Sequence, residues 1–168
     1  MDVPEISDVV VAYDLESLER QPVPREGALD AMRQRGQRKA AQVLRAIPHD
    51  EEGHFNPREV DELLLRAHRE LQRLNEEFQQ PQRILELLRP TVKLLQERGV
   101  SPVRVVDVGC GLGYVMRWFA ANQTFGPNVE LIGCDFNRAL VDEANRLRTV
   151  ESLDCQFLVA NAFALAEP

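Results

Sequence analysis

The sequence predicts an α/β protein in which a helical region, residues 1–100, precedes a parallel, doubly wound sheet in residues 101–168. Three observations support this prediction. Residues 1–100 are rich in Arg, Glu, Gln and Leu, and their apolar residues recur at helical spacing. From Val103 onward, short β-branched runs alternate with helical patterns. A glycine-rich stretch, VVDVGCGLG at 105–113, lies where the first β-branched run ends.

The clearest helical pattern of the first region spans residues 56–78. Asn56 suits the N-cap, Pro57 the first helical position, and Glu59 the position from which a capping-box acid reaches back. The apolar residues recur at alternating steps of four and three, which predicts one stripe that packs on the same domain or, alternatively, on a second chain. This stripe consists of Val60, Leu64, Ala67, Leu71, Leu74 and Phe78.

The other segments of the first region have less regular patterns. Residues 27–47 predict one weakly amphipathic helix. We expect Pro81 to end the helix before it, and the next helix to kink or break at Pro90 and to close at Gly99. The opening DVVVAYDL, residues 8–15, fits either a strand or an extended arm, and the pattern does not choose between them.

The second region alternates strand and helix patterns. Three strands are expected, at Val103–Val108, 129–135 and 155–163, and the first should be buried on both faces. Asn137 suits the N-cap of the second connecting helix. The inner faces of the two connecting helices consist of Leu112, Val115, Met116 and Phe119, and of Leu140, Val141, Ala144, Leu147 and Val150. In such a sheet ligands bind where the strands end, and the glycine-rich stretch lies there.

The glycine spacing and the acid before it indicate what kind of ligand the loop accepts. A dinucleotide-binding loop has the order G-x-G-x-x-G, but Tyr114 stands where its last glycine belongs. Asp107 precedes the glycines, and a carboxylate in that position would repel a pyrophosphate. A phosphate-binding loop of the G-x-x-x-x-G-K type is also excluded, because no lysine follows. We therefore expect a ligand that presents a positive group.

Three motifs together resemble those of the class I S-adenosylmethionine-dependent methyltransferases. VVDVGCGLG resembles the family's first motif, IGCDFN at 132–137 the acidic end of its second strand, and VANAF at 159–163 its third strand. The resemblance covers about residues 103–165, and it implies a Rossmann-like sheet with S-adenosyl-L-methionine as the cofactor. It also implies the cofactor-binding residues, which are Asp107, Gly109, Cys110, Gly111, Gly113, Asp135, Phe136, Asn161 and Ala162.

The resemblance assigns a role to most of these positions. Asp107 would bind the amino group of the cofactor, directly or through water, and the glycine loop would let the backbone approach the methionine part. Asp135 would accept both ribose hydroxyls, and Phe136 would lie against the adenine. Asn161 replaces an acid that often reads the adenine amine, and its side-chain oxygen can accept the same hydrogen bond. Taken singly, Asp107 also fits a helix-capping acid, Asp135 an N-cap and Asn161 a turn residue.

The resemblance further implies a longer sheet than the three strands of this chain. We therefore expect the N-terminal part of a methyltransferase whose catalytic residues lie beyond Pro168, with residues 1–100 as a cap that shapes the substrate site. Alone, the chain should be inactive and prone to aggregate through the edge of its first strand. The methyl acceptor is not specified by any residue. Two alternatives stay open: a noncatalytic methyltransferase-like subunit that binds a partner through its helices, and a nicotinamide- or flavin-dependent oxidoreductase.

Composition and charge narrow the cellular context. The net charge of −7 argues against general nucleic-acid binding, although the stretch Arg33–Arg45 contains basic residues and no acid. No apolar run approaches the roughly 20 residues of a membrane helix. The acidic start MDVPEISD does not fit a secretion signal, so a cytoplasmic protein is expected.

Cysteine and histidine positions predict no metal site. The three cysteines lack metal-ligand spacing, and we expect reduced thiols that fill space in the interior. The histidines lie among acids and prolines, and we expect them at the surface. These residues are Cys110, Cys134 and Cys155, and His49, His54 and His68.

Overall fold

The structure, a computed structural model, describes residues 7–164. It divides into two compact units, Met1–Leu64 and Leu65–Pro168. The boundary falls inside the helix α4, Pro57–Glu77, so this helix contributes to both units. The second unit thus combines helices that precede residue 100 with the sheet that follows it. The predicted domain division at residue 100 stays a prediction.

The first unit is built from short elements. α1, Ser7–Val10, leads into an antiparallel pair of strands, β1 at Ala12–Tyr13 and β2 at Arg20–Gln21. The helices α2, Arg25–Gln34, and α3, Arg38–Ala46, follow. Together with the start of α4 they enclose a small core of Val10, Leu29, Met32, Leu44, Ile47, Phe55 and Val60.

The opening segment and the segment 27–47 are now defined. The opening forms one helical turn and a short strand, and residues 1–6 lie outside the described residues. The single helix predicted over 27–47 is wrong, because Gly36 takes a left-handed conformation with φ +72° and ends α2. The N–H groups of Gly36 and Gln37 donate to the carbonyls of Arg33 and Met32, which is the hydrogen-bond pattern of a glycine-closed helix.

In the second unit, α4 is followed by α5, Gln80–Glu97. We predicted a kink or a break at Pro90, and the break is wrong, because α5 is one continuous helix through Pro90. Leu85 and Val92, on either side of Pro90, are buried in the core. Pro81 lies in the first turn of α5, where its missing N–H costs nothing. Gly99 closes the helix as predicted, with φ +83°.

None of the helices within residues 7–164 is both long and apolar enough to cross a membrane.

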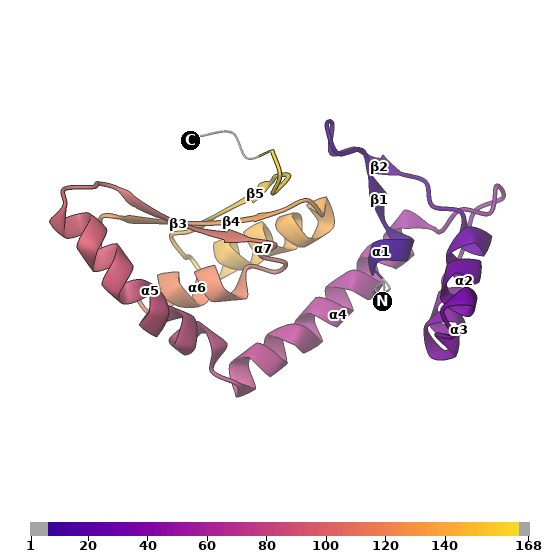
Figure 1. Ribbon diagram of the computed structural model, residues 1–168, viewed down its shortest axis with the longest axis horizontal. Helices are drawn as coiled ribbons and strands as arrows, with labels where there is room; N and C mark the ends of the chain where they lie inside the picture. The colour runs from indigo at the N-terminus through magenta and orange to yellow at the C-terminus, as the bar shows by residue number, and fades with distance from the viewer. Residues whose placement is uncertain (1–6, 165–168) are drawn as a thin grey trace. The chain divides into compact units, whose positions relative to one another are not determined.

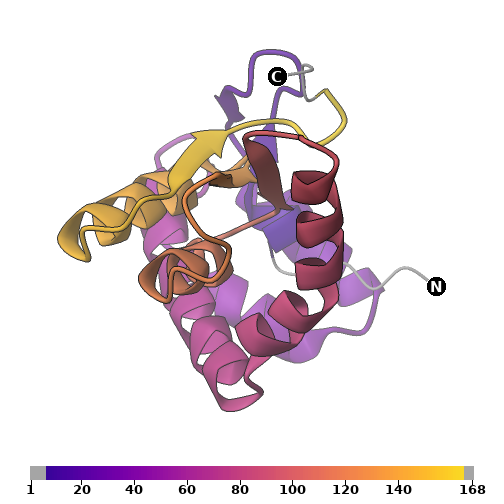
Figure 2. The same ribbon diagram turned by 90° about the vertical axis from the view of Figure 1, so that its left-hand side faces the viewer.

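The sheet of the second unit has three parallel strands in the order β3-β4-β5, as Figures 1 and 2 show. β3 is Val103–Val108, β4 is Val129–Asp135 and β5 is Gln156–Val159. The connections are α6, Tyr114–Ala121, and α7, Arg138–Val150. The predicted Rossmann-like α/β arrangement with three parallel strands is confirmed.

The helices cover one face of this sheet, and α5 and α6 lie on the same side of it in Figure 1. The opposite face is open: Val106 and Val108 are 48% and 51% exposed. The prediction that β3 is buried on both faces is therefore wrong for the described residues, because β3 is an edge strand with helices on one side only. The core between helices and sheet includes Leu85, Val92, Val103, Val105, Met116, Phe119, Leu131, Val141, Ala144 and Phe157.

Two predicted helix stripes are buried only in part. In α4, Val60 and Leu64 are buried, but Leu71, Leu74 and Phe78 are exposed. In α7, the inner face is buried through Ala144, whereas Val150 in the last turn is exposed. The stripe of α4 therefore packs at its start and leaves an apolar surface at its end.

Candidate functional site

The predicted cofactor-binding residues gather where the parallel strands end. Asp107 is near the end of β3, and Asp135 is the last residue of β4. The glycine loop, Gly109–Gly113, connects β3 to α6, and Asn161 follows β5. Because parallel strands end at the same edge of a sheet, these segments share one edge, where such folds bind ligands.

All three glycines of the loop require their residue type. Gly109, Gly111 and Gly113 have φ of +76°, +53° and +68°, in the left-handed region that other residues rarely enter. A Cβ added at Gly113 would lie 2.1 Å from the ring of Phe157, and one at Gly111 would lie 2.7 Å from the ring of His68. A Cβ at Gly109 would meet nothing within 4 Å. Gly111 and Gly113 thus permit close packing, whereas Gly109 leaves open space beside the backbone for a ligand.

Hydrogen bonds hold the loop against β4. The N–H groups of Gly109 and Cys110 both donate to the carbonyl of Cys134, at 2.8 and 3.0 Å. The N–H of Gly111 donates to Oδ2 of Asp135 at 3.0 Å, and the N–H of Gly113 donates to the carbonyl of Cys110 at 2.8 Å. The loop is therefore shaped before any ligand binds.

Asp135 links this loop to the next helix. The side chain is buried, and its Oδ1 accepts a hydrogen bond from the N–H of Asn137 at 2.9 Å while Oδ2 accepts from Gly111. Asn137 caps α7 as predicted, since its Oδ1 accepts from the N–H groups of Ala139 and Leu140. Each carboxylate oxygen of Asp135 can still accept a further hydrogen bond from a ligand.

Asp107 is a half-buried carboxylate without a side-chain partner among the described residues. No residue within 7–164 donates a hydrogen bond to its side chain or forms an ion pair with it. Burial, and after it the negative charge of Asp135, raises the pKa of the Asp107 carboxyl. Asp107 also lines a groove of about 350 Å³ that runs along β3 between α5 and α6. An ionised Asp107 would be stabilised by a cationic group bound beside it.

The thiols of all three cysteines have raised pKa values. Burial raises the pKa of the Cys110 thiol, and the charges of Asp135 and Asp107 raise it further. Burial also raises the pKa of Cys134, and it raises that of Cys155 to about 11. All three cysteines are free, and Cys134 and Cys155 are fully buried. They stay protonated at neutral pH, which suits the space-filling role that was predicted.

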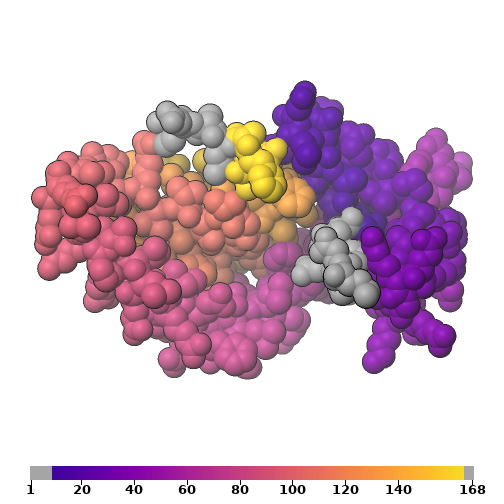
Figure 3. Space-filling view, viewed as in Figure 1, coloured from indigo at the N-terminus to yellow at the C-terminus, as the bar shows by residue number. Residues whose placement is uncertain are grey.

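The residues expected at the adenine are more exposed than the loop. Phe136 directly follows Asp135 and is 52% exposed, so much of its ring is accessible. The side-chain oxygen of Asn161 accepts a hydrogen bond from the N–H of Phe163 at 2.9 Å, which is the turn role considered as its alternative. Ala162 and Phe163 are exposed, and the segment after β5 forms the yellow projection in Figure 3.

Sequence patterns did not single out two side chains that contact the loop. Arg117 of α6 is buried, and its Nε donates to the carbonyl of Leu112 at 3.2 Å. His68 of α4, expected at the surface, is half-buried and lies against Gly111. The only sequence feature that could have indicated a buried Arg117 is its position next to the apolar stripe of its helix. No local pattern indicates the position of His68.

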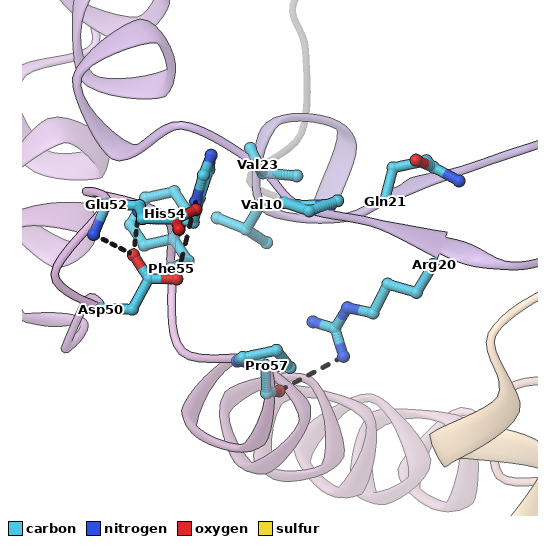
Figure 4. A pocket seen from close by; sticks show the side chains of 10 residues that line it. Val10, Arg20, Gln21, Val23, Asp50, Glu52, His54, Phe55 and Pro57 are labelled. Carbon is cyan, nitrogen blue, oxygen red and sulfur yellow. Dashed lines mark hydrogen bonds and ion pairs between the residues drawn. The ribbon is translucent and has the colours of Figure 1, made fainter.

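A separate pocket of about 300 Å³ lies in the first unit (Figure 4). Its charged side chains pair with neighbours: Arg20 donates to Asp61 at 2.6 Å and to the carbonyl of Pro57. Asp50 accepts from the N–H groups of Glu52 and His54, at 3.0 and 2.8 Å. The bonds of Arg20 join β2 to the start of α4, and those of Asp50 close a turn, so these charged groups already have partners within the chain.

Comparison with known proteins gives a match to the second unit and several similar solved structures. Residues 105–168 match a family model described as a methyltransferase domain. The chain is similar to the PH0226 protein from Pyrococcus horikoshii OT3, with 21% identity over 51% of this chain and 37% of that chain, and a TM-score of 0.34. No curated protein matches the chain.

Two further solved structures are similar. A SAM-dependent methyltransferase from Aquifex aeolicus has 22% identity over 52% of this chain and 50% of that chain, with a TM-score of 0.36. The plantazolicin methyltransferase BpumL, solved with a pentazolic desmethylPZN analog and SAH, has 17% identity over 67% of this chain and 38% of that chain, with a TM-score of 0.40. The chain spans half or less of the length of these solved structures.

Proposed function

We propose that the protein is a class I S-adenosylmethionine-dependent methyltransferase that transfers a methyl group from S-adenosylmethionine to an acceptor, because residues 105–168 match a family model described as a methyltransferase domain. One observation supports the site more than any other. Asp107 is a half-buried carboxylate without a partner among the described residues, and it precedes the glycine whose Cβ position is open. This arrangement suits the ammonium group of the cofactor and opposes a pyrophosphate.

The remaining contacts of the cofactor follow from the strand ends. The backbone at Gly109 leaves room for the methionine part. Asp135 has one free acceptor position on each oxygen, and these suit the two ribose hydroxyls. Phe136 offers an exposed ring to the adenine, and Asn161 would accept a hydrogen bond from the adenine amine. Cys110 and Ala162 contribute backbone beside the cofactor.

The bound cofactor supplies a methyl group that its sulfonium already activates. The chain therefore has to bind and orient the cofactor and to exclude water from it, and it does not have to supply a nucleophile. The hydrogen bonds from Gly109, Gly111 and Gly113 keep the loop in one conformation, so little order has to be created on binding. Asp107 would hold the amino group and Asp135 the ribose, on either side of the sulfonium, and together they would set the direction of the methyl group.

The proposal does not specify the chemical class of the methyl acceptor or the residues that bind it. The chain spans half or less of the length of the similar solved structures, so the activity of the whole protein and its acceptor are part of this proposal. Residues 1–100, with the half of α4 that contacts the glycine loop, would form a cap on the substrate side. A location in the cytoplasm is part of this proposal.

Calorimetric titration with S-adenosylhomocysteine and with NAD tests the proposal. We expect the purified protein to bind S-adenosylhomocysteine and to bind NAD more weakly, because Asp107 attracts an ammonium and repels a pyrophosphate. NAD binding of equal or greater strength would favour an oxidoreductase and overturn the methyltransferase function.

A noncatalytic subunit is the second candidate, and the exposed end of the α4 stripe favours it. Leu71, Leu74 and Phe78 form an apolar surface that a partner or a second copy can cover. Cofactor binding without methyl transfer, together with a complex that is lost in Leu74→Glu, would support this candidate over the enzyme.

A further inference from the structure

The interior of the second unit holds one buried arginine that the cofactor contacts do not explain. Arg117 of α6 is 5% exposed, although a buried guanidinium costs free energy unless its N–H groups find acceptors. A leucine or methionine at this place in α6 would fill the space without that cost. The arginine therefore needs a reason beyond packing.

The partners of Arg117 come from three segments. Its Nε donates to the carbonyl of Leu112, inside the glycine loop, at 3.2 Å. Its Nη2 donates to Oε1 of Gln72 in α4 at 2.9 Å, and its Nη1 pairs with Glu151, just after α7. Two side chains thus hold the guanidinium, and the guanidinium holds a loop carbonyl.

The bond to Leu112 complements the other constraints on the loop. The N–H groups of Gly109, Cys110 and Gly111 are held by β4, through the carbonyl of Cys134 and the carboxylate of Asp135. Leu112 lies between the last two glycines, and its carbonyl is held from the opposite side, by α6. The start of the loop is therefore fixed by the sheet and its end by Arg117.

α4 contributes to the same arrangement at two more points. The ring of His68 packs against Gly111, where an added Cβ would be 2.7 Å from it. Arg69 pairs with Glu143 of α7 at 3.1 Å. The part of α4 after Leu65 is thus joined to the loop and to α7 around Arg117.

We propose that Arg117 is a positioning residue: through the carbonyl of Leu112 it keeps the glycine loop in the conformation that binds S-adenosylmethionine, and Gln72 and Glu151 hold it in place. This inference rests on the proposed function for the identity of the ligand. Arg117 does not touch the cofactor, so its effect passes through the loop.

The test compares Arg117→Ala with Arg104→Ala. Arg104 is an exposed arginine of β3 that pairs with Glu130 at 2.8 Å, away from the loop, so it controls for loss of an arginine and of an ion pair. We expect Arg117→Ala to weaken S-adenosylhomocysteine binding about 10-fold or more, as loss of a charged hydrogen-bond donor does, and Arg104→Ala to bind like the parent. Ethylguanidinium chloride should restore part of the affinity of Arg117→Ala only, because it can occupy the vacated position.

Hydrogen exchange without cofactor supplies the second readout. The amides of Gly111 and Gly113 should exchange faster in Arg117→Ala than in the parent and in Arg104→Ala, and ethylguanidinium should slow them again. Unchanged loop exchange and affinity in a folded Arg117→Ala, or a loss that ethylguanidinium does not reverse, would overturn the positioning role. If Arg117→Ala does not fold, Arg117→Lys replaces it, and loop exchange that stays parental there also overturns the role. A parent protein that shows these loop effects but binds no S-adenosylhomocysteine would instead overturn the proposed function.

Discussion

Asp107 and Asp135 lie near the carboxyl ends of two adjacent strands, and burial together with the charge of Asp135 raises the pKa of Asp107. Asp135 has hydrogen-bond donors from Gly111 and Asn137, whereas Asp107 has no partner among the described residues. The two carboxylates thus differ in their partners: Asp135 organises the loop, and we propose that Asp107 binds a cationic group of the ligand.

Asp107→Asn should stabilise the free protein and abolish tight cofactor binding. A raised pKa means that the ionised carboxyl costs stability at neutral pH, and that the cost fades as the pH falls toward the ordinary pKa of an aspartate. The gain in melting temperature should therefore be present at pH 7 and shrink in acid. Calorimetry without cofactor measures it, with Asp154→Asn in the turn before β5 as an exposed control. A lower melting temperature with parental cofactor affinity would contradict this prediction.

Asp135→Ala should weaken cofactor binding by roughly 2–4 kcal/mol, because it removes charge-assisted hydrogen bonds to the ribose hydroxyls. It should also lower the free energy of unfolding by about 1–3 kcal/mol, since the N–H groups of Gly111 and Asn137 lose their acceptor. Asp135→Asn keeps one acceptor oxygen and should cost less in both respects. Titration calorimetry and denaturant unfolding measure the two effects. Parental cofactor affinity in both folded variants would show that the ribose assignment is wrong.

A comparison of Gly113→Ala with Gly109→Ala should separate the loss of stability caused by a clash in the core from the loss of cofactor affinity caused by a blocked ligand site. At Gly113 the new methyl would lie 2.1 Å from Phe157, whose ring is buried in the core, so we expect a loss of about 3 kcal/mol or more. At Gly109 the new methyl would meet open space, so the variant should lose only the about 1–2 kcal/mol of stability that a left-handed backbone costs an alanine. Gly109→Ala should nevertheless reduce cofactor affinity. Urea unfolding of both variants measures whether Gly113→Ala is destabilised more than Gly109→Ala, and equal destabilisation would contradict the prediction.

Val106→Lys should reduce self-association of the 168-residue chain. Val106 lies on the open face of β3, and β3 has no further strand beside it within residues 7–164, which leaves an apolar edge for another chain. A lysine there should block edge pairing. Leu87→Lys, on α5 and 77% exposed, adds the same charge elsewhere. Size-exclusion chromatography over a range of concentrations should show a shift for Val106→Lys alone; an equal shift for both variants would show that charge, not the edge, is responsible.

Element types and the location of the site could be predicted from local patterns. The strand Val103–Val108, the strand ending at Asp135 and the cap at Asn137 all match the structure, because β-branched runs, glycine turns and capping side chains act over a few neighbouring residues. The same holds for the closure of α5 at Gly99. Where Gly36 was overlooked, two helices were predicted as one.

Burial and contacts between distant residues could not be read from the sequence. The pattern of β3 fits two buried faces, yet which faces are covered depends on the elements that pack there, and helices cover only one. The apolar stripe of α4 is likewise regular throughout but buried only at its start. Arg117 finds acceptors at Leu112, Gln72 and Glu151, which come together only on folding. Local chemistry thus specifies the loop and its acids, and Arg117 reaches Leu112 from only five residues away. The contacts that hold the Arg117 guanidinium at Gln72 and Glu151 arise instead from packing between segments far apart in the chain.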